Sequence, residues 1–174
     1  MEVQTHLMSG WCVADLFDLT PRERLFAMIA ASAADLDGLG ILISIDYYAA
    51  YHHVLGHNLL FAVITSSVLT PFCTHRAKAF LLFLALFHLH LFLDYLGSGP
   101  EWPIYYLWPF SGLAIRNPQS WEISSWQDIC AAGIFFLWLL AIAIRRGRTP
   151  LEAIMPSLDQ KIVRTLKRAV TRVV

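Results

Sequence analysis

Charged residues are scarce in this chain of 174 residues: they make up 15% of it, whereas hydrophobic residues make up 57%. Soluble domains contain about 25% charged and about 45–50% apolar residues. A water-soluble globule of this length would have too few charges for its surface. The same composition excludes a disordered chain, because disorder requires low hydrophobicity and high net charge. The sequence therefore predicts an integral membrane protein, long enough for one domain.

Cysteine pairs and a cleavable leader are also missing. The three cysteines stand singly in apolar stretches, at Cys12, Cys73 and Cys130, and no CxxC motif occurs. This excludes a disulfide scaffold and favours buried, inert thiols. The first residues show no charged n-region, apolar h-region or small-residue cleavage site, so we expect no removable signal peptide.

Long apolar runs are present and predict membrane passes. Residues 129–144 carry no charge, and residues 79–97 are broken only by His88, His90 and Asp94. Residues 58–74 have the minimum length for a span, and the shorter stretches 7–19 and 25–34 are candidates for tilted half-spans or for helices packed inside the bundle. The predicted fold class is all-α: an integral membrane helical bundle of about five embedded helices, followed by a basic amphipathic C-terminal helix.

Lysine and arginine positions predict the orientation of these passes. Basic residues cluster between or after apolar runs at three places, 22–24, 76–78 and 145–148. Placing all three clusters in the cytoplasm requires alternating passes, with the N-terminus outside and the C-terminus inside. Five passes satisfy this requirement, in a bacterial-type inner (plasma) membrane. Residues 98–126, rich in tryptophan and proline, then form an external loop at the headgroup level.

The segment 149–174 differs from the membrane-embedded segment 1–148 and is predicted to be a cytoplasmic tail. Residues 145–174 hold eight Lys/Arg against two acidic residues, whereas the first 144 residues hold five against eleven. Lysines and arginines face one side of the tail, which favours an interfacial helix on anionic lipid headgroups. Packing on a partner protein is the alternative. Nucleic acid is not expected as a partner, because no nucleic-acid module is evident, and the oligomeric state is left open. The apolar side contains Leu158, Ile162, Val163, Leu166, Ala169, Val170 and Val173.

Ionisable residues inside apolar runs are costly and mark function by default. His53 and His57 are four residues apart, as are His90 and Asp94, so each pair would share one face of a helix. Histidine and carboxylate ligands without thiols suit zinc, with manganese or iron as weaker alternatives. In the predicted topology all candidate ligands fall toward the outer ends of their segments. They are His6, Asp35, Asp37, His53, His57, His90 and Asp94.

Seven such residues are too many for one tetrahedral zinc ion and predict two or three metals with bridging carboxylates. A purely structural polar network is the alternative for the same residues. We interpret His52 and His88 as hydrogen-bonded core residues, because each neighbours a better-spaced histidine, and His75 as an interfacial residue. The Trp-Pro-Phe segment at 108–110 has two interpretations, an interfacial anchor or a wall over the site.

The order of these motifs resembles that of a known family. The chain has Thr-His at 5–6, Asp-x-Asp at 35–37, His-x-x-x-His-Asn at 53–58, His-x-x-x-Asp at 90–94 and Trp-Pro-Phe at 108–110. This order, over roughly residues 1–115, resembles the YdjM-like family of inner-membrane proteins that are regarded as metal-dependent hydrolases. The family pattern has proline, arginine, threonine and serine where this chain has Ala34, Val54, Gly56 and Asn58. By resemblance, the family is distantly similar to zinc-dependent phospholipase C, an all-helical phosphoesterase with a zinc cluster.

The residues and the resemblance together predict a membrane-bound metal-dependent hydrolase at the outer membrane face. The expected substrate is a phosphoester of a lipid or lipid-linked molecule, attacked by metal-activated water. Asp35 or Asp37 is the candidate general base. Two other functions remain open: a zinc-dependent intramembrane amide hydrolase of the ceramidase type, and a non-catalytic membrane metal-binding protein. A di-iron lipid desaturase is less favoured, because the chain lacks an HxxHH box.

Overall fold

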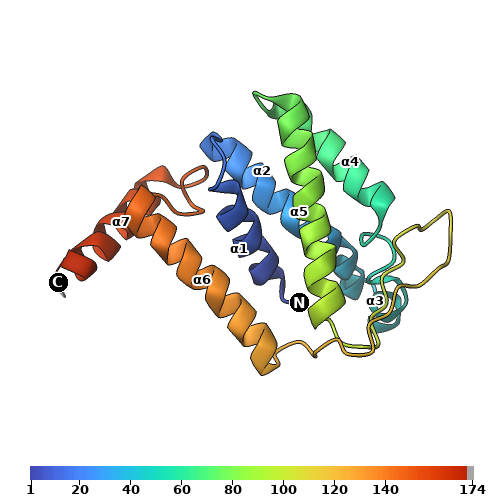
Figure 1. Ribbon diagram of the computed structural model, residues 1–174. Helices are drawn as coiled ribbons and strands as arrows, with labels where there is room; N and C mark the ends of the chain where they lie inside the picture. The colour runs from blue at the N-terminus through green and yellow to red at the C-terminus, as the bar shows by residue number, and fades with distance from the viewer. Residues whose placement is uncertain (172–174) are drawn as a thin grey trace.

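A computed structural model describes residues 1–171 of the chain (Figure 1). These residues form helices and connecting loops and contain no strand, only an isolated antiparallel bridge between Ile104 and Ile115. Val173, the last member of the predicted apolar stripe, lies outside the described residues. The elements are α1 (Val3–Ala14), α2 (Pro21–Ser32), η1 (Ala33–Leu42), α3 (Ile45–Tyr51), α4 (Leu59–Leu69), η2 (Thr70–Phe72), α5 (Arg76–Gly97), α6 (Trp126–Arg146) and α7 (Pro156–Thr171).

Within residues 1–171, three helices are long and apolar enough to cross a membrane: Pro21–Leu42, Arg76–Gly97 and Trp126–Arg146. The all-helical class is thereby confirmed. The predicted apolar stretch 25–34, a half-span or a packed helix, is part of a longer helical segment, because η1 continues α2 as far as Leu42. Leu59–Phe72 is a shorter apolar helix. The 12 residues of α1 extend about 18 Å, less than the hydrocarbon thickness of about 30 Å. Five embedded helices therefore stay a prediction.

α2 begins at a capping box that also ties it to α5. The Thr20 hydroxyl accepts a hydrogen bond from the Glu23 N–H, and the Glu23 carboxylate accepts one from the Thr20 N–H at 2.8 Å. The other Glu23 oxygen accepts the N–H of Thr74, just before α5, at 2.7 Å. These bonds satisfy backbone donors that a helix start leaves free. They hold the basic ends of α2 and α5 together.

Close packing of α1 on α2 positions His6. A Cβ atom added to Gly10 would lie 2.7 Å from the Ala31 Cβ and 2.9 Å from the Ala27 carbonyl oxygen. Small residues of this kind let helices approach closely in membranes. α2 in turn packs on α5, so α1 comes near α5 as well. The ring of His6 stacks on that of His90, with centroids 3.8 Å apart.

Basic residues and candidate metal ligands lie at opposite ends of the bundle. The basic clusters stand at the starts of α2 and α5 and at the end of α6. His6 is in the first turns of α1, Asp35 and Asp37 follow α2 in η1, and Asp94 is in the last turn of α5. The N-terminus accordingly lies beside the C-terminal end of α5 (Figure 1). The fold brings together the chain segments that were predicted to converge.

Candidate metal centre

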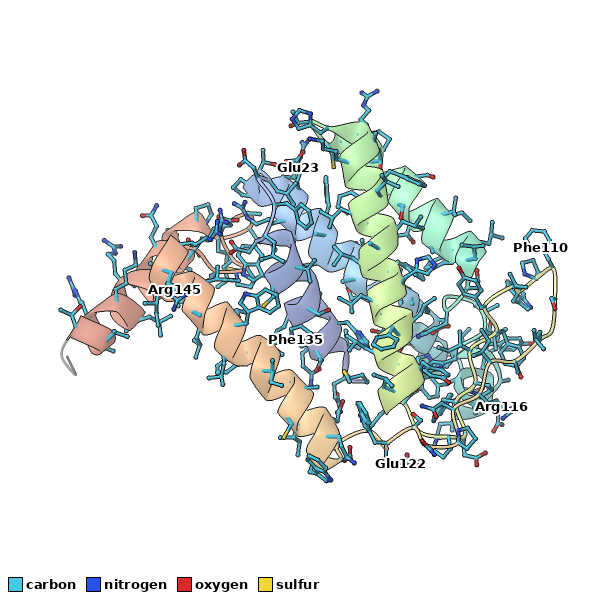
Figure 2. The ribbon with its side chains drawn as sticks, in the orientation of Figure 1. Glu23, Phe110, Arg116, Glu122, Phe135 and Arg145 are labelled. Carbon is cyan, nitrogen blue, oxygen red and sulfur yellow. The ribbon has the colours of Figure 1, made fainter. Side chains whose placement is uncertain are left out.

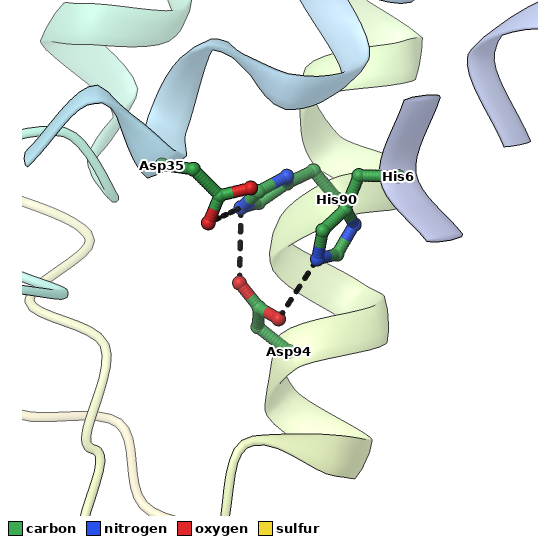
Figure 3. A group of neighbouring side chains, drawn as sticks. All are labelled: His6, Asp35, His90 and Asp94. Carbon is green, nitrogen blue, oxygen red and sulfur yellow. Dashed lines mark hydrogen bonds and ion pairs between the residues drawn. The ribbon is translucent and has the colours of Figure 1, made fainter. Parts of the chain in front are cut away.

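The candidate metal centre is built around Asp94, near the end of α5. The Asp94 carboxylate is buried, and its oxygens lie 3.1 Å from His6 Nε2 and 2.9 Å from His90 Nε2 (Figure 3). His57 Nε2 lies 3.1 Å from the same carboxylate, and His53 Nε2 lies 3.8 Å from it. Histidines from α1, α5 and the turn before α4 thus share one carboxylate.

Asp35 reaches the same centre from η1. Its Oδ1 lies 3.7 Å from His90 Nε2 (Figure 3), and its Oδ2 is buried without a hydrogen-bond partner. The Nδ1 atoms of His6 and His53 are also buried and unpartnered. Unpaired polar atoms in an interior cost free energy and call for an explanation, such as a bound ion. The residues fit a metal: His6, Asp35, His90 and Asp94 offer ligand atoms that all lie within 4.8 Å of one another.

The hydrogen bonding of His90 shows which ring atom faces the centre. Its Nδ1 lies 2.8 Å from the carbonyl oxygen of Ala31. A carbonyl only accepts, so Nδ1 carries the proton and Nε2 of the neutral ring is a bare lone pair. That lone pair faces Asp94 and lies 3.2 Å from His57 Nε2. The Asp94 carboxylate beside these nitrogens attracts a cation to the same place. An Nδ1–H bound to a backbone carbonyl is also the usual arrangement of a metal-ligating histidine.

Asp37 orients His57 in the same way. His57 Nδ1 donates to Asp37 Oδ2 at 2.9 Å, which turns His57 Nε2 toward Asp94. Burial lowers the pKa of His57, but hydrogen bonds to Asp37 and Asp94 outweigh it and raise the pKa to about 9. Without a metal, His57 therefore keeps a proton at neutral pH. The centre gathers positive charge, since the N-terminal ammonium of Met1 also lies 2.5 Å from Asp94 Oδ1, and a metal ion would supply such charge in place of these groups.

The turn that carries His53 and His57 is not helical, so the predicted reason for their pairing was wrong. α3 ends at Tyr51, and His53 has a φ of 66°, a left-handed conformation that is uncommon for a residue other than glycine. Such backbone conformations concentrate at functional sites. Burial, together with the neighbouring His57, holds the pKa of His53 well below its ordinary value. His53 therefore presents a neutral ring, the form that binds metals.

Gly56 and Asn58 hold this turn in place. A Cβ atom added to Gly56 would lie 2.1 Å from the carbonyl oxygen of Ala34, so only glycine allows the turn to approach η1. The Gly56 N–H donates to Asp37 Oδ2 at 2.9 Å. The Asn58 side chain accepts the N–H of Phe61 at 2.8 Å and thereby caps α4. Two positions that depart from the predicted family pattern therefore have structural roles here.

A family model described as YdjM inner membrane protein matches residues 1–161. The chain belongs to the YdjM inner membrane protein family. The match confirms the resemblance drawn from the motifs and extends it through α6 into α7. No curated protein and no solved structure matches the chain significantly. The distant similarity to zinc-dependent phospholipase C stays a prediction.

The histidines set aside by sequence reasoning have different surroundings in this YdjM family protein. His52 is hydrogen-bonded, as predicted, but its partner belongs to the site: its Nδ1 donates to Asp37 Oδ1 at 2.7 Å. With Asp37 and His57 it forms a further group of side chains close enough together to hold a metal ion. Helical geometry would have pointed His52 away from His53, and the non-helical turn removes that separation. His88 has the predicted hydrogen-bonded role: Nδ1 donates to the Leu84 carbonyl, and Nε2 accepts from the Tyr106 hydroxyl. His75 is exposed just before α5.

A small cavity of about 50 Å³ opens beside the centre of this YdjM family protein. Asp35, His52 and His53 line it together with two aromatic residues, Tyr48 and Trp102. The Trp102 ring centroid lies 5.2 Å from that of His52 and 5.7 Å from that of His53. Trp102 was missed as a site residue, because no spacing in the sequence relates it to the histidines.

The Trp-Pro-Phe motif at 108–110 does not line this cavity. Phe110 is 83% exposed and lies at the tip of the long loop, away from α5 (Figure 2). The loop is attached to the bundle through Tyr106, whose carbonyl accepts the N–H of Leu59 at 2.9 Å and whose hydroxyl contacts His88. The interpretation of the motif as a wall over the site was therefore wrong, and Trp102 occupies that place.

Proposed function

We propose that this protein is a membrane-bound metal-dependent hydrolase. The observation that carries the proposal is the convergence of imidazole Nε2 atoms on the buried Asp94 carboxylate, with the Nδ1 atoms of His57 and His90 engaged elsewhere. Zinc suits these ligands, with manganese or iron as alternatives. A divalent ion supplies Lewis acidity, which makes water nucleophilic at neutral pH. The overlapping ligand groups support two or three ions. The proposed ligands are His6, Asp35, His53, His57, His90 and Asp94.

Asp37 fits an orienting role better than the ligand role expected from its Asp-x-Asp spacing. Its two oxygens accept hydrogen bonds from His52 Nδ1, His57 Nδ1 and the Gly56 N–H. Carboxylates that hold the second nitrogen of a ligand histidine fix its tautomer and ring orientation. Asp37 thus acts through its neighbours, and Asp35 is the better general base.

Asp35 has the geometry of a general base. Its side chain is 13% exposed, compared with 1% for Asp94. It lines the cavity, where water has access, and its Oδ2 has no hydrogen-bond partner. A general base must reach the proton that it removes. The unpartnered Oδ2 of Asp35 would accept the proton from the attacking water, while its Oδ1 stays directed at His90 and the centre.

The depth of the centre favours a lipid phosphoester as the substrate. α5 has 22 residues, and Asp94 lies three residues before its end at Gly97. Asp94 is therefore about 5 Å from the end of a helix about 33 Å long. A helix of this length ends near the headgroup region. A centre at this depth meets the phosphoester of a lipid or lipid-linked molecule, on the outer face if the positive-inside orientation holds.

The size of the cavity favours one second candidate, a non-catalytic metal-binding protein. About 50 Å³ has room for water but is too small for a lipid headgroup. His6, His57 and His90 are fully buried. If the site does not open further, it binds metal tightly without turnover.

Metal content and turnover, measured on the purified protein in detergent, distinguish these functions. We expect two or three zinc ions per chain and hydrolysis of bis(p-nitrophenyl) phosphate. His90→Ala is expected to lose both, Asp35→Asn to lose turnover more than metal, and His75→Ala to keep both. Tight metal binding without phosphoester hydrolysis leaves the non-catalytic function, and a single zinc with amide hydrolysis supports the ceramidase type. Metal retained after both His57→Ala and Asp94→Ala refutes the centre.

A further inference from the structure

The end of the molecule opposite the metal centre carries a helix that hydrolysis does not use. α7 follows the turn after α6 and lies beside the basic end of that helix (Figure 1). Its only acidic residue, Asp159, is 5% exposed and accepts the N–H of Thr149 at 2.6 Å. α7 therefore presents only positive charge to its surroundings. The exposed basic residues are Lys161, Arg164, Lys167 and Arg168.

The opposite face of α7 is apolar and partly open. Leu158, Ile162, Leu166 and Val170 recur every four residues and so lie along one side of the helix. Leu158 is 40% exposed and Val170 is 42% exposed. Two more large apolar residues continue this surface in the preceding turn, at Ile154 and Met155, and are 58% and 49% exposed. The described part of the chain therefore covers this face only in part.

Two ion pairs, each with one buried partner, fix the start of this tail against the bundle. Arg148 pairs with Asp15 just after α1, and Arg24 Nε in α2 lies 2.5 Å from Glu152 Oε1. Asp15 and Arg24 are each 3% exposed. The contacts hold the tail at the level of the basic clusters, near Arg145 (Figure 2). The basic end of the bundle and α7 consequently form one region of positive charge.

We propose that α7 and the adjoining end of α6 form a docking surface for an anionic phospholipid bilayer. Charge complementarity selects this occupant, because four exposed cations lie beside Arg145 and Arg146, where helices long enough to span a membrane reach its surface. A helix with this division of faces lies in the interface, with its apolar side at the acyl boundary and its cations among phosphates. Nucleic acid would leave the apolar side exposed. The docked helix fixes the membrane depth of the basic end, independently of the metal centre.

Hydrogen exchange of the full-length protein in lipid nanodiscs tests this surface. We expect the amides of α7 to exchange about tenfold more slowly, or slower still, in discs with 30% phosphatidylglycerol than in phosphatidylcholine alone. Each removed charge should weaken the anionic-lipid effect about fivefold. The fourfold variant Lys161→Gln, Arg164→Gln, Lys167→Gln and Arg168→Gln should therefore exchange equally fast in both lipids. Lys161→Arg with Lys167→Arg should retain the difference, as should Arg116→Gln in the loop at the other end.

Two outcomes overturn the proposal. In the first, the α7 amides of the native protein exchange at the same rate in both lipids. In the second, the fourfold glutamine variant still exchanges more slowly in the discs with phosphatidylglycerol. If an added oligonucleotide slows α7 exchange and phosphatidylglycerol does not, the basic face of α7 binds nucleic acid and not lipid. Exchange of α5 amides serves as the folding control, because these helical residues pack in the bundle away from α7. Unchanged α5 exchange in every variant shows that the bundle is intact.

Discussion

Replacing Gly56 with alanine adds one methyl group at the tightest point of the turn that carries His53 and His57. The new Cβ would lie 2.1 Å from the Ala34 carbonyl oxygen and 3.2 Å from Asp37 Cγ, whereas real Cβ contacts below 3.0 Å essentially do not occur. The turn must therefore move by about 1 Å, which is enough to cost about 100-fold in rate at a catalytic site. The movement also disrupts the hydrogen bond from the Gly56 N–H to Asp37.

The expected result for Gly56→Ala is a 10–100-fold loss of zinc affinity, the usual cost of losing an outer-shell contact. Competition with a chromophoric zinc chelator measures this loss on the metal-free protein in detergent. Gly112→Ala and Gly133→Ala are matched controls, because an added Cβ there has no neighbour within 4 Å. Both should bind zinc like the native protein, with unchanged helix content by circular dichroism. Native zinc affinity in Gly56→Ala, or an equal loss in the controls, refutes this account of the turn.

Three further predictions concern pH, orienting groups and topology. His57 has a pKa of about 9, so a metal must displace its proton, and zinc affinity should rise about tenfold per pH unit between 7 and 9. Calorimetry in buffers of different ionisation enthalpy would detect the released proton. A zinc affinity that does not change with pH contradicts the assignment of His57 as a ligand. Asp37→Asn should weaken zinc binding about 10–100-fold without removing a zinc ion, so loss of one ion per chain would show that Asp37 is itself a ligand. A reporter fused after Val174 should be cytoplasmic and a tag at Gly112 should react with impermeant reagents, and the reverse result at both sites overturns the orientation.

The part of the centre that could be predicted from the sequence is the part set by local geometry. His90 and Asp94 lie four residues apart in a helix of 22 residues, and their side chains meet at 2.9 Å. Regular helices repeat every 3.6 residues, so this contact needs no knowledge of the rest of the fold. The sequence also predicted a membrane protein directly, because its long apolar helices carry few charges and need a bilayer to keep them from water.

The remaining contacts depend on how separate segments pack, which no spacing in the sequence encodes. His53 and His57 are neighbours because their turn packs against η1, where Gly56 has room for no side chain. His52 and Trp102 join the centre for the same reason, since a non-helical turn and a long loop bring them there. By itself the sequence determined the long apolar helices, the membrane environment and the residue types of the centre, since these follow from composition and local periodicity. The tertiary structure alone decided which ring nitrogen faces the centre, because Asp37 and the Ala31 carbonyl, which hold the other nitrogens, are distant in the chain.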